Sequence, residues 1–228
     1  MDHMTGTPRQ RARAQAIEDI KRIARDQVAR EGGAALSLRA IARELGIVSS
    51  AVYRYVPSRD ELLTMLIVDA YNSLGDAVEA AEARVDRADR RGRWTAIGTA
   101  VREWAVARPA EYALLYGSPV PGYEAPPERT GAPGTRVSML LLALVEETSG
   151  HAGRSKTIPG PLGADFAHLR HDLDLTASDD LLARAFLAWS SLFGLIGFEL
   201  FGQFNGSITA PAAHFEHQLG RLADLLQL

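Results

Sequence analysis

Apolar residues recur every three or four positions along most of this chain. In residues 9–30, for example, Ile17, Ile20, Ala24 and Val28 repeat at that spacing. This is the period of one face of an α-helix, whereas a half-buried strand alternates apolar and polar residues, and no run of strand length alternates here. The pattern therefore predicts an all-α protein of about nine helices without a sheet.

Two stretches interrupt the helical pattern, and we expect both to be long connections. Residues 118–134 contain five prolines and three glycines, which favour turns and loops. Residues 150–176 are the second expected connection. Helix starts are clearer, because Ser37 and Ser58 precede apolar segments as N-cap residues, and Glu61 completes a capping box with Ser58. A helix is therefore expected to begin after each of these two serines.

The segment after Ser37 predicts two short helices joined by a tight turn. Ala42 is small enough to let two helices cross closely, and Gly46 allows the positive φ that such a turn requires. Val52 would fill the wedge between the helices. A helix-turn-helix of this kind presents the outer face of its second helix, about Ser49 to Tyr55, to the major groove of DNA.

Side chains of that second helix carry the hydrogen-bonding groups that DNA recognition requires. Ser49, Ser50, Tyr53 and Arg54 project from the helix or from its start. Their hydroxyls and guanidinium group can reach phosphates and base edges. The pattern therefore indicates a DNA-binding segment near the N-terminus.

The run from Leu36 to Leu63, LSLRAIARELGIVSSAVYRYVPSRDELL, resembles the DNA-binding signature of the TetR family of bacterial regulators. The likeness extends from Arg13 to Leu74. It implies an N-terminal three-helix DNA-binding domain, residues 9–60, and a C-terminal ligand-binding and dimerisation domain, residues 61–228. By position it implies DNA contacts from Ser37, Arg39, Val48, Ser49, Ser50, Tyr53, Arg54, Tyr55 and Arg59, with Ser37, Tyr55 and Arg59 on phosphates.

Two positions of the signature depart from the usual family pattern. Val48 stands where a small polar residue is frequent, and Tyr55-Val56 replaces the usual His-Phe pair. Further along, the segment from Trp189 to Gly194 is similar to the Trp…His-Gly signature of one C-terminal subgroup, with Phe193 in place of the histidine. The resemblance implies a homodimer, usually a repressor, that responds to a small molecule.

Charge is divided unevenly along the chain. The net charge of −3 by itself argues against a nucleic-acid partner. Residues 1–60, however, carry eleven Lys and Arg against seven Asp and Glu, a balance of +4, and the remaining residues carry −7. An acidic body would orient the basic part toward DNA, so the division favours double-stranded DNA as a partner.

A set of mostly aromatic side chains in the middle of the chain could line an apolar ligand cavity. Its members are Trp94, Trp104, Tyr112, Tyr116, Met139, Trp189 and Phe193. Ordinary core packing explains the same residues equally well. A small, largely apolar effector is expected on the first interpretation.

Apolar stripes on the last two predicted helices indicate a homodimer interface. Both stripes exceed what one small helical bundle must bury, and helix pairs from two chains can close a four-helix interface. The residues expected in that interface are Leu192, Ile196, Leu200, Phe215, Leu219 and Leu222. Gly194 and Gly197 would permit close approach of the two chains.

Nothing in the sequence favours an enzyme, a cofactor or a metal site. No Gly-x-Ser-x-Gly elbow or phosphate-binding Gly-Lys-Ser/Thr loop is present, and there is no cysteine. His168 and His171 have metal-ligand spacing beside Asp172 and Asp174, but a chance cluster is the favoured interpretation. His214 and His217 repeat the spacing, and a solvated or interface face is favoured there. The apolar run of 14 residues, 185–198, is too short to span a membrane.

The sequence therefore predicts a dimeric, cytoplasmic helix-turn-helix regulator that binds a pseudo-palindromic operator. Residues 1–8 lack the apolar core of a secretory signal and are expected to form a flexible leader. We expect a repressor that a ligand releases from DNA. The alternatives are an activator, a constitutive repressor without a ligand, or an enzyme or interaction module that uses the helix-turn-helix as a scaffold.

Overall fold

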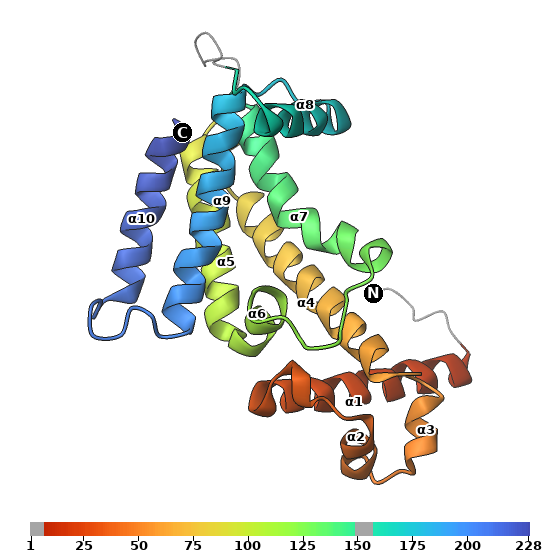
Figure 1. Cartoon of the computed structure of the whole chain (residues 1–228). Coiled ribbons are helices and arrows are strands. Elements are labelled where there is room, and N and C mark those ends of the chain that lie inside the picture. The colour runs from red at the N-terminus through yellow and green to blue at the C-terminus, as the bar shows by residue number, and fades with distance from the viewer. Residues whose placement is uncertain (1–6, 149–156) are drawn as a thin grey trace. The chain divides into compact units, whose positions relative to one another are not determined.

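A computed structural model describes residues 7–148 and 157–228, which form ten α-helices and one 3₁₀ turn without any strand (Figure 1). The expected all-α fold is confirmed. The elements are α1 Pro8–Glu31, η1 Gly33–Ala35, α2 Leu38–Glu44, α3 Ser49–Tyr53, α4 Arg59–Glu82, α5 Arg90–Ala107, α6 Pro109–Tyr116, α7 Pro127–Glu146, α8 Pro161–Leu173, α9 Asp179–Leu200 and α10 Pro211–Leu226. The leader at residues 1–6 and the start of the expected second connection lie outside the described residues.

Helices α7 and α8 correct the two expected connections. Helix α7 begins at Pro127, inside the proline-rich stretch, and it includes Pro133. Proline is tolerated at the first helical position because its missing N–H would have no helical partner there. Helix α8 occupies 13 residues of the second stretch. Leu162, Phe166, Leu169 and Leu173 recur at helical spacing along it, although only Phe166 is buried.

The chain divides into two compact units, and α4 and α7 each contribute to both. The first unit contains residues up to 72 together with residues 108–134, and the second contains residues 73–107 and 135–228. The first unit therefore extends beyond the expected DNA-binding domain of residues 9–60. The added segment belongs there because α6 packs on α1.

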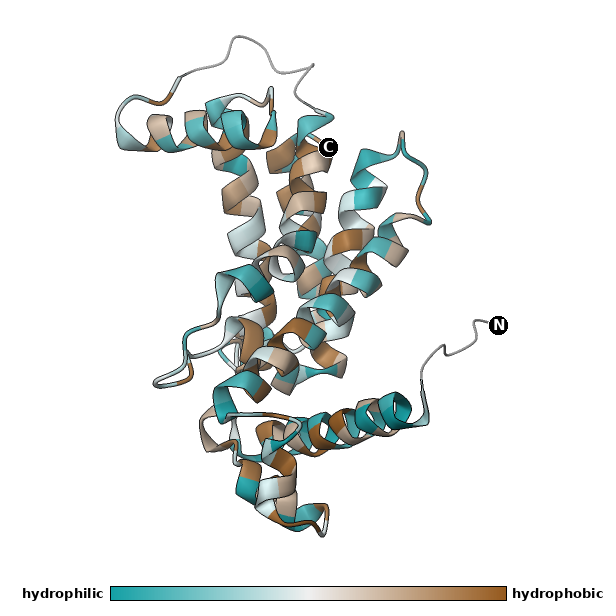
Figure 2. Ribbon diagram, turned by 90° about the vertical axis from the view of Figure 1, so that its right-hand side faces the viewer, coloured by the Kyte–Doolittle hydropathy of each residue, from teal (hydrophilic) through white to brown (hydrophobic). Residues whose placement is uncertain are grey.

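The helix-turn-helix of the first unit is built as expected. Ala42 and Val52 are completely buried where α2 and α3 meet, and Gly46 adopts a φ of +70° in the turn. Helix α1 supplies the opposite wall of this core with residues such as Ile20 and Ala24. Figure 2 shows the alternation of apolar and polar residues along α1. Below, "head" denotes α1, η1, α2, α3 and the first turn of α4.

Helices α5, α9 and α10 pack side by side in the second unit (Figure 1). Gly98 of α5 makes the close approach possible, because a Cβ on this residue would lie 2.5 Å from Leu219 Cδ1 of α10. Trp94 Nε1 donates a hydrogen bond of 2.9 Å to the Leu219 carbonyl oxygen. The centre of this unit is therefore a tightly packed helical layer.

Candidate DNA-binding surface

The side chain of Ser37 fixes the start of α2. Its Oγ accepts a hydrogen bond of 3.3 Å from the N–H of Ala40, as an N-cap does. Its own N–H donates to Gln27 Oε1 of α1 at 3.1 Å. The start of α2 is thus tied to α1, and the prediction of Ser37 as an N-cap is confirmed. Its phosphate contact stays a prediction.

The second helix of the motif, α3, is short and turns a polar face to solvent. Val48 occupies its N-cap position without a side-chain hydrogen bond and is 71% exposed. Tyr53 is 45% exposed, and Ser50 and Arg54 are exposed as well. Because Val52 points into the core, these side chains point away from it. Of the four expected recognition residues, only Ser49 is partly buried.

Arg13 of α1 holds the C-terminal end of α3. Its Nη1 donates to the carbonyl oxygen of Arg54 at 3.4 Å. Its guanidinium group also lies 5.5 Å from the centre of the Tyr55 ring, a cation–π distance. Tyr55 packs against the core of the head, so its ring has a structural role beside the expected phosphate contact.

Arg59 acts inside the protein in this structure. Its Nη2 donates to the carbonyl oxygens of Gly33 and Ala34 at 3.0 and 3.1 Å, and its Nη1 lies 3.3 Å from Asp60 Oδ1. The sequence resemblance implies a phosphate contact for this residue instead. The guanidinium group ties the start of α4 to η1, so a phosphate would have to compete with two carbonyl oxygens.

Exposed basic side chains also lie on α1 and α2 of the head. Arg39 and Arg43 of α2 are exposed, and Arg9 and Arg11 extend the basic character along α1. Lys21, in contrast, is buried against Glu18 and Asp69 at 2.5 and 2.8 Å. Burial lowers its pKa, but the hydrogen bonds to the two carboxylates outweigh this and raise the pKa above its usual value. Lys21 therefore joins α1 to α4 rather than facing DNA.

None of the seven residues expected in a ligand cavity lines the pocket on α10 or the pocket beside α1 and α2 described below. Trp94, Trp104 and Tyr112 are buried, and Trp104 Nε1 donates to Ser73 Oγ at 3.0 Å. Met139 and Trp189 are exposed. The other two members, Tyr116 and Phe193, are partly buried. Core packing explains the first three, and the ligand role stays a prediction.

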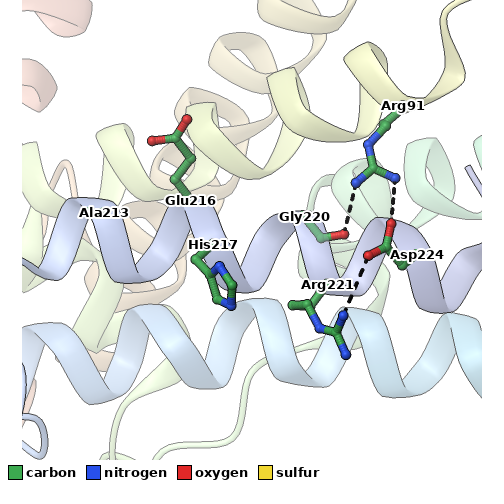
Figure 3. A pocket seen from close by; sticks show the side chains of 7 residues that line it. All are labelled: Arg91, Ala213, Glu216, His217, Gly220, Arg221 and Asp224. Carbon is green, nitrogen blue, oxygen red and sulfur yellow. Dashed lines mark hydrogen bonds and ion pairs between the residues drawn. The ribbon is translucent and has the colours of Figure 1, made fainter.

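One described pocket, of about 490 Å³, lies on the outer face of α10 (Figure 3). Its lining is charged and already paired, since Arg91 contacts Asp224 at 2.8 Å and the Gly220 carbonyl oxygen at 3.3 Å. The other pocket, of about 300 Å³, lies beside α1 and α2 with Arg30 and Glu44 in its lining. Neither has the apolar lining expected for an apolar effector.

Four of the six residues expected in a dimer interface are packed inside the chain itself. They are Leu192, Ile196, Phe215 and Leu219. Since α9 and α10 bury these side chains against each other and against α5, a second chain cannot reach them, and this part of the prediction is wrong. Leu200 and Leu222 are partly buried.

The exposed face of α9 carries a different stripe, which the sequence analysis missed. Leu187, Phe198 and Phe201 are 53%, 53% and 48% exposed. Ser190 and Gly194 lie between them at helical spacing and are also exposed, and a Cβ on Gly194 would meet no atom within 4 Å. This exposed stripe is Leu187, Ser190, Gly194, Phe198 and Phe201. The three- and four-residue spacing was visible in the sequence, but α9 is apolar on nearly every side.

Two further features of the second unit carry no function by themselves. Within residues 7–148 and 157–228, no three His, Asp or Glu side chains gather into a possible metal site, and this includes His168 and His171. Helix α9 has the length and hydropathy of a membrane span, but the core helix of a soluble protein has the same composition.

Comparison with known proteins identifies both parts of the chain. Residues 22–66 match the family described as "Bacterial regulatory proteins, tetR family", and residues 94–222 match "Tetracyclin repressor-like, C-terminal domain". The HTH-type transcriptional regulators Rv1816 of Mycobacterium tuberculosis and Mb1846 of Mycobacterium bovis are each 43% identical to this chain over 222 residues. Each alignment covers 96% of this chain and 95% of the relative.

Solved structures agree with these relatives. The crystal structure of SCO4313, described as a regulatory protein, is 36% identical with a TM-score of 0.77, covering 96% of this chain and 100% of that one. A TetR family transcription regulator from Marinobacter aquaeolei VT8 shares the fold at 20% identity, with a TM-score of 0.61 and coverage of 95% and 97%.

Proposed function

Because the chain belongs to the TetR family of bacterial transcriptional regulators, we propose that it contacts its operator through the exposed face of α3. Ser50, Tyr53 and Arg54 supply hydroxyl and guanidinium groups for base edges, and Val48 supplies an apolar surface for a thymine methyl group. The observation that carries this proposal is the exposure of these side chains on a helix whose opposite face is anchored by the buried Val52.

Phosphate contacts complete the proposed interface. Ser37, Arg39 and Tyr55 lie on α2 or just after α3, where the backbone of DNA passes when α3 enters the major groove. Arg59 joins them if its bonds to the Gly33 and Ala34 carbonyl oxygens open on binding. Such contacts fix the register of the protein but carry no base sequence.

A mobility-shift series tests this interface with a duplex selected from a random pool by the parent chain. Arg54→Ala and Tyr53→Ala are each expected to raise Kd about tenfold or more, without loss of helical circular dichroism. Arg221→Ala is the matched control, since this exposed arginine lies on α10 of the second unit. Parent-like binding by both α3 variants would show that another surface reads the DNA.

The same proposal includes a homodimer formed by the exposed stripe of α9. Large side chains at its ends and small ones at Ser190 and Gly194 allow two helices to approach closely. Two heads would then read two half-sites about 34–36 Å apart, which is one helical turn of DNA. Sedimentation of a monomer at micromolar concentration would contradict the dimer.

The third part of the proposal is that the protein is a repressor, which a small, largely apolar effector releases from DNA. We also propose that it acts in the cytoplasm. Support for release by an effector is the match of residues 94–222 to a repressor-type C-terminal domain, together with the abundant aromatic side chains there. A thermal-shift screen with apolar metabolites tests it, followed by a DNA-release assay for each hit. An effector must bind the free and DNA-bound states with different affinities, so a hit that leaves operator affinity unchanged would count against it.

A further inference from the structure

The connection between α6 and α7 packs on the head, although it lies much later in the chain than the head itself. We call this connection together with the first turn of α7, residues 117–129, the strap. Val120 and Tyr123 of the strap pack against the buried core of the head, as does Leu114 of α6. The approach is close at Gly33, where a Cβ would lie 2.9 Å from Val120 Cγ2. Residues up to 72 therefore do not cover their own core without this segment.

Two polar contacts fasten the strap to the first turns of α4. The hydroxyl groups of Tyr123 and Thr64 lie 2.9 Å apart. Thr64 is buried, and its hydroxyl proton is already donated to the Asp60 carbonyl oxygen at 2.9 Å. Tyr123 is therefore the donor in the pair. In addition, Arg129 contacts Glu61 across 2.6 Å.

The start of α4 is also tied to η1 of the head. Arg59 links this turn to the carbonyl oxygens of Gly33 and Ala34, directly after α1. Helix α3 ends only six residues earlier, and Val56 between the two helices is completely buried. The strap and Arg59 together thus hold the first turns of α4, which connect the DNA-reading helix to the rest of the first unit.

We propose that the strap positions the head for DNA binding, with Tyr123 and Arg129 as positioning residues that do not touch DNA. Loosening the strap lowers the fraction of heads in the binding-competent arrangement, and the apparent Kd rises in inverse proportion to that fraction. The proposal rests on the family's DNA-binding activity and on the proposed contacts of α3. Any event that shifts α6 or the start of α7 then acts on operator affinity through these contacts.

The first experiment measures operator affinity and its salt dependence for Tyr123→Phe and Arg129→Gln, using the selected duplex as the probe. We expect Kd to rise about fivefold for Tyr123→Phe, the factor that corresponds to one lost hydrogen bond. The slope of log Kd against log salt stays at the parent value, whereas loss of a phosphate contact would change it by about one unit.

Arg136→Gln is the matched control for Arg129→Gln. Arg136 lies on the same helix and pairs with Asp76 and Glu79 at 2.6 and 2.8 Å, but all three belong to the second unit. We expect parent-like binding from this variant. Equal Kd values for Arg129→Gln, Tyr123→Phe and Arg136→Gln would overturn the proposal, and so would a slope change of about one unit in either strap variant.

A second experiment restores the strap by a covalent bond. The chain has no cysteine, so Gly33→Cys with Val120→Cys creates a single pair. The 2.9 Å between a Gly33 Cβ and Val120 Cγ2 is close to the Cβ–S separation of about 3 Å across a disulfide. In a chain that also carries Tyr123→Phe, oxidation is expected to return Kd to the parent value, and reduction to raise it again.

An oxidised triple variant that binds as weakly as the reduced one would overturn the proposal even if Tyr123→Phe alone folds poorly. Failure of the strap is also distinguishable from failure of the proposed DNA surface. In the first case Arg54→Ala weakens binding and the strap variants do not. In the second case Arg54→Ala binds like the parent.

Discussion

The head and helix α9 of the second unit show opposite relations between sequence and exposure. In the head, most buried positions, such as Val52, are apolar, and most exposed positions, such as Ser50 and Arg54, are polar, so residue type separates the two faces apart from exceptions such as Val48 and Lys21. In α9, Leu192 is completely buried, whereas Leu187, five residues earlier, is half exposed. Residue type does not separate the two faces there.

This difference indicates which kind of partner would suit each surface. A polar exposed face on an apolar core suits a charged, hydrated partner such as DNA. An apolar exposed face on an apolar core suits a partner that removes it from water, such as a second copy of the same helix. The predictions below test whether the two regions differ in this way.

The largest effect is expected from the buried side of α9. Leu192→Ala should lower the free energy of unfolding by about 2–5 kcal/mol, because it leaves a cavity in a packed core. Leu187→Ala is the matched change on the exposed side, and we expect about 0.5 kcal/mol or less in the monomer. Urea denaturation at concentrations that favour the monomer gives both values. Equal losses would show that the two faces of α9 do not differ.

Replacing glycine by alanine should change the stability in opposite directions at Gly98 and Gly194. Gly98→Ala forces a Cβ to within 2.5 Å of Leu219 Cδ1, and overpacking of this kind costs about 1–3 kcal/mol. Gly194→Ala meets open space on α9 and should stabilise the monomer by about 0.5–1 kcal/mol through helix propensity. Thermal denaturation of both variants checks the signs.

Gly194→Leu extends this test to the dimer. A leucine here has space in one chain but would hold two α9 helices apart. We expect analytical ultracentrifugation to show a shift toward monomer, together with an unfolding free energy no lower than that of the parent. Retention of the dimer would place the interface on another face of the second unit.

In the head, Gly46→Ala should cost about 1 kcal/mol of stability, since its φ of +70° lies in the left-handed region that a Cβ disfavours. The strain falls on the turn between α2 and α3, so operator binding should weaken as well. Gly131→Ala is the comparison, because a Cβ there meets no atom and its φ is not positive. Similar losses in both variants would contradict the role of the turn.

The smallest expected effect is a pH dependence in the second unit. Hydrogen bonds from the Ile158 N–H at 2.7 Å and from Arg170 at 2.5 Å lower the pKa of the Asp179 carboxyl group. A lowered folded-state pKa contributes stability that is complete above the unfolded value of about 3.9 and is lost as pH falls through the folded value. Below about pH 4, Tm should therefore fall less steeply in Asp179→Asn than in the parent.

The helix-turn-helix could be predicted from sequence because each of its constraints acts locally. A small residue at Ala42, a positive φ at Gly46 and an apolar Val52 leave few other local structures, and all three behave as expected. The roles of Arg59 and Tyr123 could not be predicted. Their partners, Gly33 and Thr64, are 26 and 59 residues away, and only the folded chain brings them together.

The same reasoning explains the errors in the second unit. Helix α8 has a short apolar stripe, Leu162, Phe166, Leu169 and Leu173, but the prolines and glycines at its start favour a connection. The sequence predicts an interface at Leu192 and Ile196 because α9 is apolar on several sides, and only packing against α5 and α10 selects which side faces inward. The spacing of apolar residues shows that a helix has an apolar face, but not which neighbouring helix or chain buries it.

The discontinuous first unit has a consequence for protein engineering. Chimeric regulators are commonly imagined as a DNA-reading cassette joined to a new sensor at a single junction. Here the residues that cover the head include Leu114, Val120 and Tyr123, which follow the second unit's first segment in the chain. A fragment that ends at residue 72 would expose this apolar surface to solvent and would be prone to aggregate. A working exchange has to carry residues 108–134 along with the cassette, which requires three junctions rather than one.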